Sequence, residues 1–89
     1  MNKKLSLPFK NESSEPVRLC LEPYCEFFLI QPREKVVVSA ICSGDASSFE
    51  FLVVHNGSFI TIYAPGAPVV LVDAYVSLNG EKMDPLPGE

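Results

Sequence analysis

The feature that most constrains this chain is the alternation of apolar and polar residues over short stretches, each ended by proline, glycine or asparagine. No window longer than a turn or two places apolar residues at helical spacing without such an interruption. A period of two puts successive side chains on opposite faces of a β-strand, and closely spaced strands separated by turn signals are typical of small sandwiches. The pattern therefore predicts an all-β fold, a small antiparallel β-sandwich of about seven strands that is Ig-like or cupredoxin-like.

The clearest local signal is Asn56-Gly57, which separates two alternating apolar runs. A type I′ turn needs positive φ at both central residues, and Asn and Gly tolerate that conformation. We therefore expect a hairpin in which His55 pairs with Ser58, because a two-residue loop fixes the register. On one face we expect a buried group made of Phe49, Phe51, Val53, Ile60 and Ile62.

The opposite face of the same hairpin would carry Leu52, Val54, Phe59 and Tyr63. This face is more apolar than a solvated surface requires, so we interpret these four residues as an interface for a protein partner or a homodimer. Burial beneath a second sheet of the same chain is the alternative. The function that follows is a non-enzymatic binding or assembly module that acts through an apolar sheet face.

Other segments place the remaining strands within a single domain over residues 1–89. Pro8 lacks a donor for a strand ladder, which predicts an edge strand near the N-terminus. The nearly continuous apolar run 36–41 predicts a central strand covered on both faces. Asn79-Gly80 repeats the hairpin signal, and the residues 84–89 that follow are expected to be a frayed tail.

Charge and composition exclude several classes of partner. The net charge is −4, and the seven basic residues form no stripe that could follow a phosphate backbone, so nucleic acid is not expected as a partner. The apolar runs are far shorter than the roughly 20 residues of a spanning helix, so no membrane is expected either. Three cysteines leave one unpaired in any disulfide scheme, which favours a reducing, cytoplasmic location.

Residues 11–40 carry a pattern in which an Asn-Ser-rich turn precedes Leu-Glu-Pro-x-x-Glu and then a Pro-x-Glu turn. The matching residues are Leu21, Glu22, Pro23, Glu26, Leu29, Pro32 and Glu34. This stretch resembles small bacterial β-sandwich proteins of unassigned function, whose pattern has Trp, Gly and Gly where this chain has Tyr24, Cys25 and Arg33. The resemblance covers about a third of the chain. It implies a small sandwich and carries no functional residues with it.

Catalytic and metal chemistry have weaker support in the sequence. A thiol enzyme would need a cysteine beside a base, and His55 is the single histidine, but no spacing selects one of the cysteines. A cupredoxin-like metal protein is the alternative function, with Cys20, Cys25, His55 and Met83 as the candidate ligands. A blue-copper centre uses two histidines, so the ligand set is incomplete. We therefore expect neither an enzyme nor a cofactor.

Overall fold

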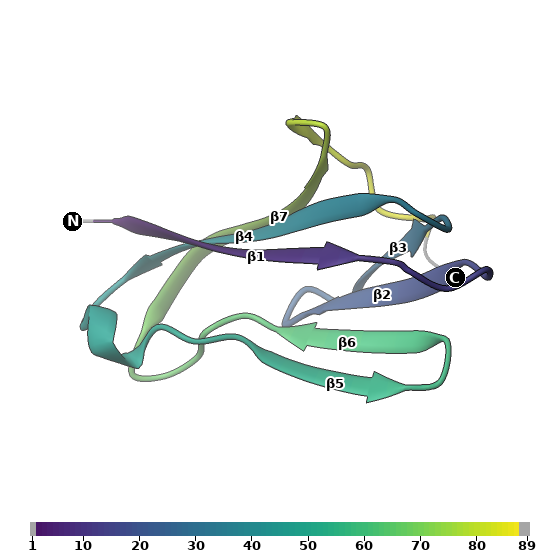
Figure 1. Ribbon diagram of the computed structural model, residues 1–89. Helices are drawn as coiled ribbons and strands as arrows, with labels where there is room; N and C mark the ends of the chain where they lie inside the picture. The colour runs from purple at the N-terminus through teal and green to yellow at the C-terminus, as the bar shows by residue number, and fades with distance from the viewer. Residues whose placement is uncertain (1, 88–89) are drawn as a thin grey trace.

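The structure, a computed structural model, describes residues 2–87 and places eight strands there in two packed sheets (Figure 1). The elements are β1 (Lys3–Lys10), β2 (Val17–Glu22), β3 (Glu26–Ile30), β4 (Lys35–Ser43), a 3-10 turn (Ala46–Ser48), β5 (Leu52–Asn56), β6 (Phe59–Tyr63), β7 (Val70–Leu78) and β8 (Glu81–Lys82). The predicted all-β sandwich is confirmed, with eight strands rather than about seven.

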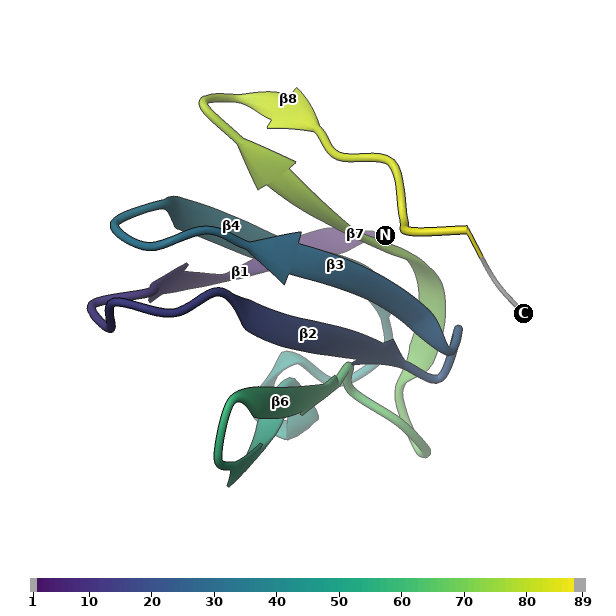
Figure 2. The same cartoon turned by 90° about the vertical axis from the view of Figure 1, so that its right-hand side faces the viewer.

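Each sheet has four strands. Sheet A has the order β1-β4-β7-β8, and sheet B has the order β3-β2-β6-β5, so that β3, β2 and β6 lie side by side (Figure 2). Among the described residues, five of the six strand pairs are antiparallel, and β2 and β6 form the one parallel pair, which the prediction of an antiparallel sandwich did not include. A parallel pair needs a long crossover, and here β3, β4 and β5 supply it.

The core lies between the inner faces of the two sheets. Its fully buried large side chains include Leu19, Leu21, Phe28, Ile30, Val36, Val38, Ile62 and Val76. β4 lies between β1 and β7 and is central, and β1, which contains Pro8, is an edge strand, as the sequence predicted. The alternation in both sheets therefore separates an inner, apolar set of side chains from an outer set.

The β5–β6 hairpin forms, but its turn differs from the prediction. Asn56 remains in the strand and pairs with Phe59, so the loop residues are Gly57 and Ser58, and Gly57 has φ +64°. A type II′ turn has glycine at the first of its two loop positions, and Gly57 occupies that position here, directly after the extended residue Asn56. The predicted pairing of His55 with Ser58 is wrong, because His55 pairs with Ile60.

This change moves the partners by two residues, which leaves each side chain on its expected face. Ile60 and Ile62 are buried, and Phe49 and Phe51 are half-buried against the core. Val53 is 46% exposed, so the prediction that it is buried with the other four is wrong. The reason is that β5 is the edge strand of sheet B.

The second Asn-Gly pair forms the predicted turn. Asn79 and Gly80 have φ values of 54° and 83°, and Leu78 pairs with Glu81 on either side of them. In the segment that follows, the Leu86 N–H donates to the Phe27 carbonyl at 2.7 Å, so this part of the predicted tail contacts the edge of sheet B. Residues 84–87 therefore run from sheet A to the edge of β3, and the last two residues of the predicted tail lie outside the described residues.

Asn11 joins the two sheets where β1 ends. Its side chain is buried and donates to the carbonyl groups of Glu15 and Ile30 at 2.8 and 3.0 Å. Its side-chain oxygen accepts from the backbone N–H and the hydroxyl of Ser13. One amide thus fixes the turn after β1 and ties it to the end of β3.

The two turns that flank β3 each contain a non-glycine residue with positive φ. Arg33 has φ 74° in the turn closed by the Glu34 N–H and the Gln31 carbonyl, and Cys25 has φ 55° between β2 and β3. A Cβ makes this conformation unfavourable for residues other than glycine.

Candidate functional site

The strand order of sheet B gathers one set of side chains on its outer side, which we call the sheet B face. β2 alternates between buried inner leucines and outward side chains, and the register extends that outward row across the neighbouring strands. The sheet B face consists of Arg18, Cys20, Glu22, Phe27, Leu29, Leu52, Val54, Asn56, Phe59, Thr61 and Tyr63. It spans all four strands of the sheet.

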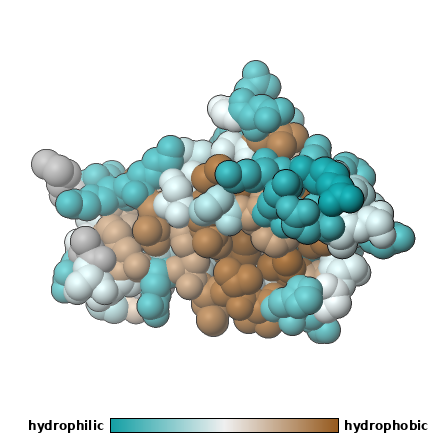
Figure 3. All heavy atoms as spheres, in the orientation of Figure 1, coloured by the Kyte–Doolittle hydropathy of each residue, from teal (hydrophilic) through white to brown (hydrophobic). Residues whose placement is uncertain are grey.

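Large apolar side chains on this face are open to solvent. Leu52 is 60% exposed, Val54 45%, Tyr63 43% and Leu29 38%. Hydrophobic surface gathers over β5 and β6 in the lower part of Figure 3, whereas hydrophilic residues cover much of the upper part, where sheet A lies. Within residues 2–87, no second sheet covers the outer side of β5 and β6.

The centre of the sheet B face is aromatic. The rings of Phe27 and Phe59 approach from either side of β2 with centroids 6.3 Å apart, and the Arg18 guanidinium lies 5.8 Å from the Phe27 ring centroid. Cys20 is buried between these neighbours although it points outward. Burial first, and the Glu22 carboxylate second, raise the pKa of the Cys20 thiol to about 11. This thiol is therefore protonated, and a weak nucleophile, at neutral pH.

Two opposite charges mark the ends of β2 on this face. Arg18 and Glu22 both point outward from the same strand. The Glu22 carboxylate accepts a hydrogen bond from the Cys20 thiol at 3.7 Å. Among the described residues, neither Arg18 nor Glu22 forms a salt bridge.

The structure places Leu52, Val54, Phe59 and Tyr63 together on the outer side of the hairpin, and Leu52 lies directly opposite Tyr63. Sequence reasoning missed that Phe27 and Leu29 extend the same surface. Their alternation with Phe28 and Ile30 assigns them to an outer face. Only the parallel pairing of β2 with β6 brings that face next to the hairpin. No local sequence pattern predicts this strand pair.

Two of the four candidate metal ligands, the cysteines, lie near each other, and the other two lie elsewhere in the fold. Cys20 lies on β2 and Cys25 in the turn that follows it, whereas His55 is on the edge strand β5. Met83 follows β8 and packs against the core. Among residues 2–87, no group of three or more His, Cys, Asp and Glu residues could hold a metal ion.

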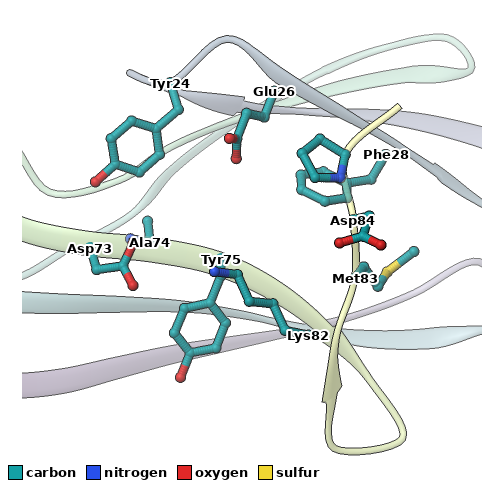
Figure 4. Close-up of a pocket in the computed structure, with 10 residues that line it drawn as sticks. Tyr24, Glu26, Phe28, Asp73, Ala74, Tyr75, Lys82, Met83 and Asp84 are labelled. Carbon is teal, nitrogen blue, oxygen red and sulfur yellow. The ribbon is translucent and has the colours of Figure 1, made fainter. Parts of the chain in front are cut away.

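A polar hollow of about 410 Å³ lies on the side of the sandwich where β3 faces β7. Tyr24 and Glu26 lie across from Asp73, with Met83 and Asp84 of the tail alongside (Figure 4). Burial, then the carboxylates of Asp73 and Glu26, raises the pKa of Tyr24. A second hollow, of about 650 Å³, lies between the β3 edge and residues 85–87, and Arg18 and Phe27 line it. The sheet B face therefore continues toward the tail.

Comparison with known proteins found no matching family model, no matching curated protein and no matching solved structure. In the part of the chain that the structure describes, no helix has the length and apolar character needed to cross a membrane. The surface chemistry of the fold is thus the basis for assigning a function.

Proposed function

We propose that this chain is a non-enzymatic binding or assembly module that acts through the sheet B face and needs no cofactor. The observation that supports the proposal most strongly is the exposure of Leu29, Leu52, Val54 and Tyr63 on one continuous sheet surface. Large contiguous apolar patches are uncommon on soluble monomers and mark interaction sites.

The composition of the sheet B face matches that of protein interfaces. Aromatic residues and arginine are enriched in interface centres, and here Phe27 and Phe59 flank Arg18 while Tyr63 lies beside Glu22 at the other end of β2. Apart from Arg18 and Glu22, the face carries no charged side chain. When a protein surface covers such a patch, few charged groups lose their water of hydration, so the free-energy cost of desolvation is small.

The proposal is tested by making the hairpin part of the face polar. In the double variant Leu52→Thr/Tyr63→Thr, threonine keeps the preference for a strand and removes apolar area. The matched control is Val70→Thr/Val72→Thr, because these β7 residues are 62% and 51% exposed on the other sheet. The measurements are the fluorescence of an anilinonaphthalene sulfonate dye, light scattering and thermal unfolding.

We expect dye emission and self-association to fall at least several-fold in the hairpin variant and to stay near the wild-type values in the control. The unfolding midpoint should change little in either variant, because the replaced side chains are largely exposed. A strictly monomeric wild-type protein with no dye-accessible patch would contradict the proposal. A loss of stability typical of a core substitution in the hairpin variant would also contradict it.

A further inference from the structure

We infer that the partner of the sheet B face is a second copy of this chain, packed face to face about a two-fold axis that sets Arg18 of one copy against Glu22 of the other. This inference rests on the proposed function, because it uses the same surface. It adds the identity of the partner and the geometry of the contact.

The charges on β2 support self-association. Arg18 and Glu22 lie on the same face of one strand, about 13 Å apart at the usual rise per residue. A two-fold axis that crosses the strands at the level of Cys20 exchanges the two ends of β2. Arg18 then meets Glu22 of the second copy, and the same contact forms twice, as in any isologous interface. Neither side chain has a salt-bridge partner within residues 2–87.

The same axis also matches the apolar parts of the two faces. Val54 and Thr61 lie at the level of Cys20, so Val54 meets Val54 of the second copy. Tyr63 lies at the level of Glu22 and Phe59 at the level of Arg18. Tyr63 of one copy therefore meets Phe59 of the other, whereas Leu52, which lies at the level of Tyr63, meets Asn56, which lies at the level of Phe59. The contact across β5 and β6 is therefore mainly apolar, with Asn56 and Thr61 as its polar members.

The lysine-bearing half of sheet A offers no comparable self-contact. The outer side of β1 and β4 carries Lys4, Lys10 and Lys35, neither strand contains an acidic residue, and the outward carboxylate of Asp73 lies on the neighbouring β7. A contact of β1 and β4 with the same two strands of a second copy would oppose like charges, which disfavours association. Among the described strands, only β2 of sheet B carries both charges of a reciprocal pair on one strand.

Charge reversal followed by mixing tests the inference, with sedimentation equilibrium as the measurement. Arg18→Glu and Glu22→Arg each place like charges at both contacts, so we expect each variant alone to dimerise at least about 10-fold more weakly than the wild type. An equimolar mixture of the two variants restores opposite charges at both contacts and should recover the dimer. The double variant Arg18→Glu/Glu22→Arg should recover it within one chain. Circular dichroism checks that each variant is folded.

Each failure has a distinct meaning. If the single reversals dimerise like the wild type while Leu52→Thr/Tyr63→Thr does not, the face is used in another arrangement, and this inference is overturned while the proposed function stands. A wild type that stays monomeric at high micromolar concentration also overturns it, and dye binding then decides the proposed function alone. If a reversal variant does not fold, Arg18→Gln and Glu22→Gln replace it. Their effects on dimerisation must then be non-additive, since either removes the same contact; additive effects would overturn the inference.

Discussion

The two outer faces of this sandwich differ in composition although both cover the same core. On sheet A, the outward row of β1 is Lys4, Ser6, Pro8 and Lys10, and that of β4 mixes Lys35 and Ser39 with the half-buried Val37 and Ile41. On sheet B, the corresponding rows are Phe27 and Leu29, Phe59 and Tyr63, and Leu52 and Val54. Both sheets need an apolar inner side to fold, but neither needs an apolar outer side. The apolar surface of sheet B is therefore in excess of what folding requires.

The edges of the two sheets show the same difference. β1 carries three lysines and a proline, which protect an edge strand against pairing with other chains. β5 has no charged residue and no proline, and all five of its residues are exposed. The β3 edge of sheet B is partly covered by the tail through Leu86. Sheet B is thus left open to a partner on its outer face and along β5.

The largest expected difference in stability is between alanine variants of two adjacent phenylalanines on β3. Phe28 points inward and is 2% exposed, whereas Phe27 points outward onto the sheet B face. We expect Phe28→Ala to lower the free energy of unfolding by about 3–5 kcal/mol and Phe27→Ala by only about 1 kcal/mol. Urea denaturation measures both. Equal losses would mean that the outer face is part of the core and would break the comparison.

The joint between the sheets gives the next largest effect. Asn11→Ala removes the donors for the carbonyl groups of Ile30 and Glu15, and we expect unfolding to become easier by about 2–3 kcal/mol because buried acceptors lose their partners. Ser14→Ala, an exposed change in the same turn, is the control and should shift the denaturation midpoint very little. An Asn11 variant as stable as the control would show that the two faces are not held in register by this side chain.

The sequence predicted the class of fold, because alternation and turn residues are local signals. It also predicted that Leu52, Val54, Phe59 and Tyr63 share a face, and the two-residue difference in register did not alter this. The same Asn-Gly dipeptide predicted a type I′ turn twice. Asn79-Gly80 has positive φ at both residues, whereas Asn56 stays in the strand and continues the ladder to Phe59.

The rest of the site could not be predicted from local signals. The order β3-β2-β6-β5 depends on a parallel pair between segments separated by three other strands, and parallel pairs have no turn signature. Without that pair, Phe27 and Leu29 cannot be assigned to the same surface as Tyr63. The contact of the tail with sheet B has no local signal either, because the hydrogen bond from Leu86 to Phe27 depends on tertiary contact alone.

Alkaline pH should reveal how well the sheet B face shields Cys20. The pKa of this thiol is about 11 in the folded protein against an ordinary value of 9.0, so the folded state holds the proton more tightly. The resulting stabilisation is fully present below pH 9 and is lost as the pH rises from 9 to 11, on the order of 2 kcal/mol. Thermal unfolding should show a smaller loss over this range in Cys20→Ala than in the wild type. Identical pH profiles would mean that water reaches the thiol.

The smallest effect concerns the two turns that flank β3, in which Cys25 and Arg33 have positive φ. Arg33→Gly and Cys25→Gly place glycine where φ is positive, and each should raise stability by about 0.5–1 kcal/mol, because relief of strain exceeds the added entropy of the unfolded chain. Ser47→Gly serves as the control, because Ser47 has a negative φ and glycine relieves no strain there. A small rise in unfolding temperature is expected for the first two variants only. Destabilisation by Arg33→Gly would show that the loss of its Glu12 salt bridge outweighs the strain.

The most direct test of the central claim compares Tyr63 on the sheet B face with Tyr75 on the outer side of sheet A. Hydroxyl-radical footprinting of the wild-type protein at low and high micromolar concentration reports the solvent access of both rings in one sample. If the sheet B face binds a second copy, Tyr63 loses reactivity as concentration rises and Tyr75 does not. Unchanged reactivity at Tyr63 in a sample that does associate, or protection of Tyr75 instead, would contradict the account.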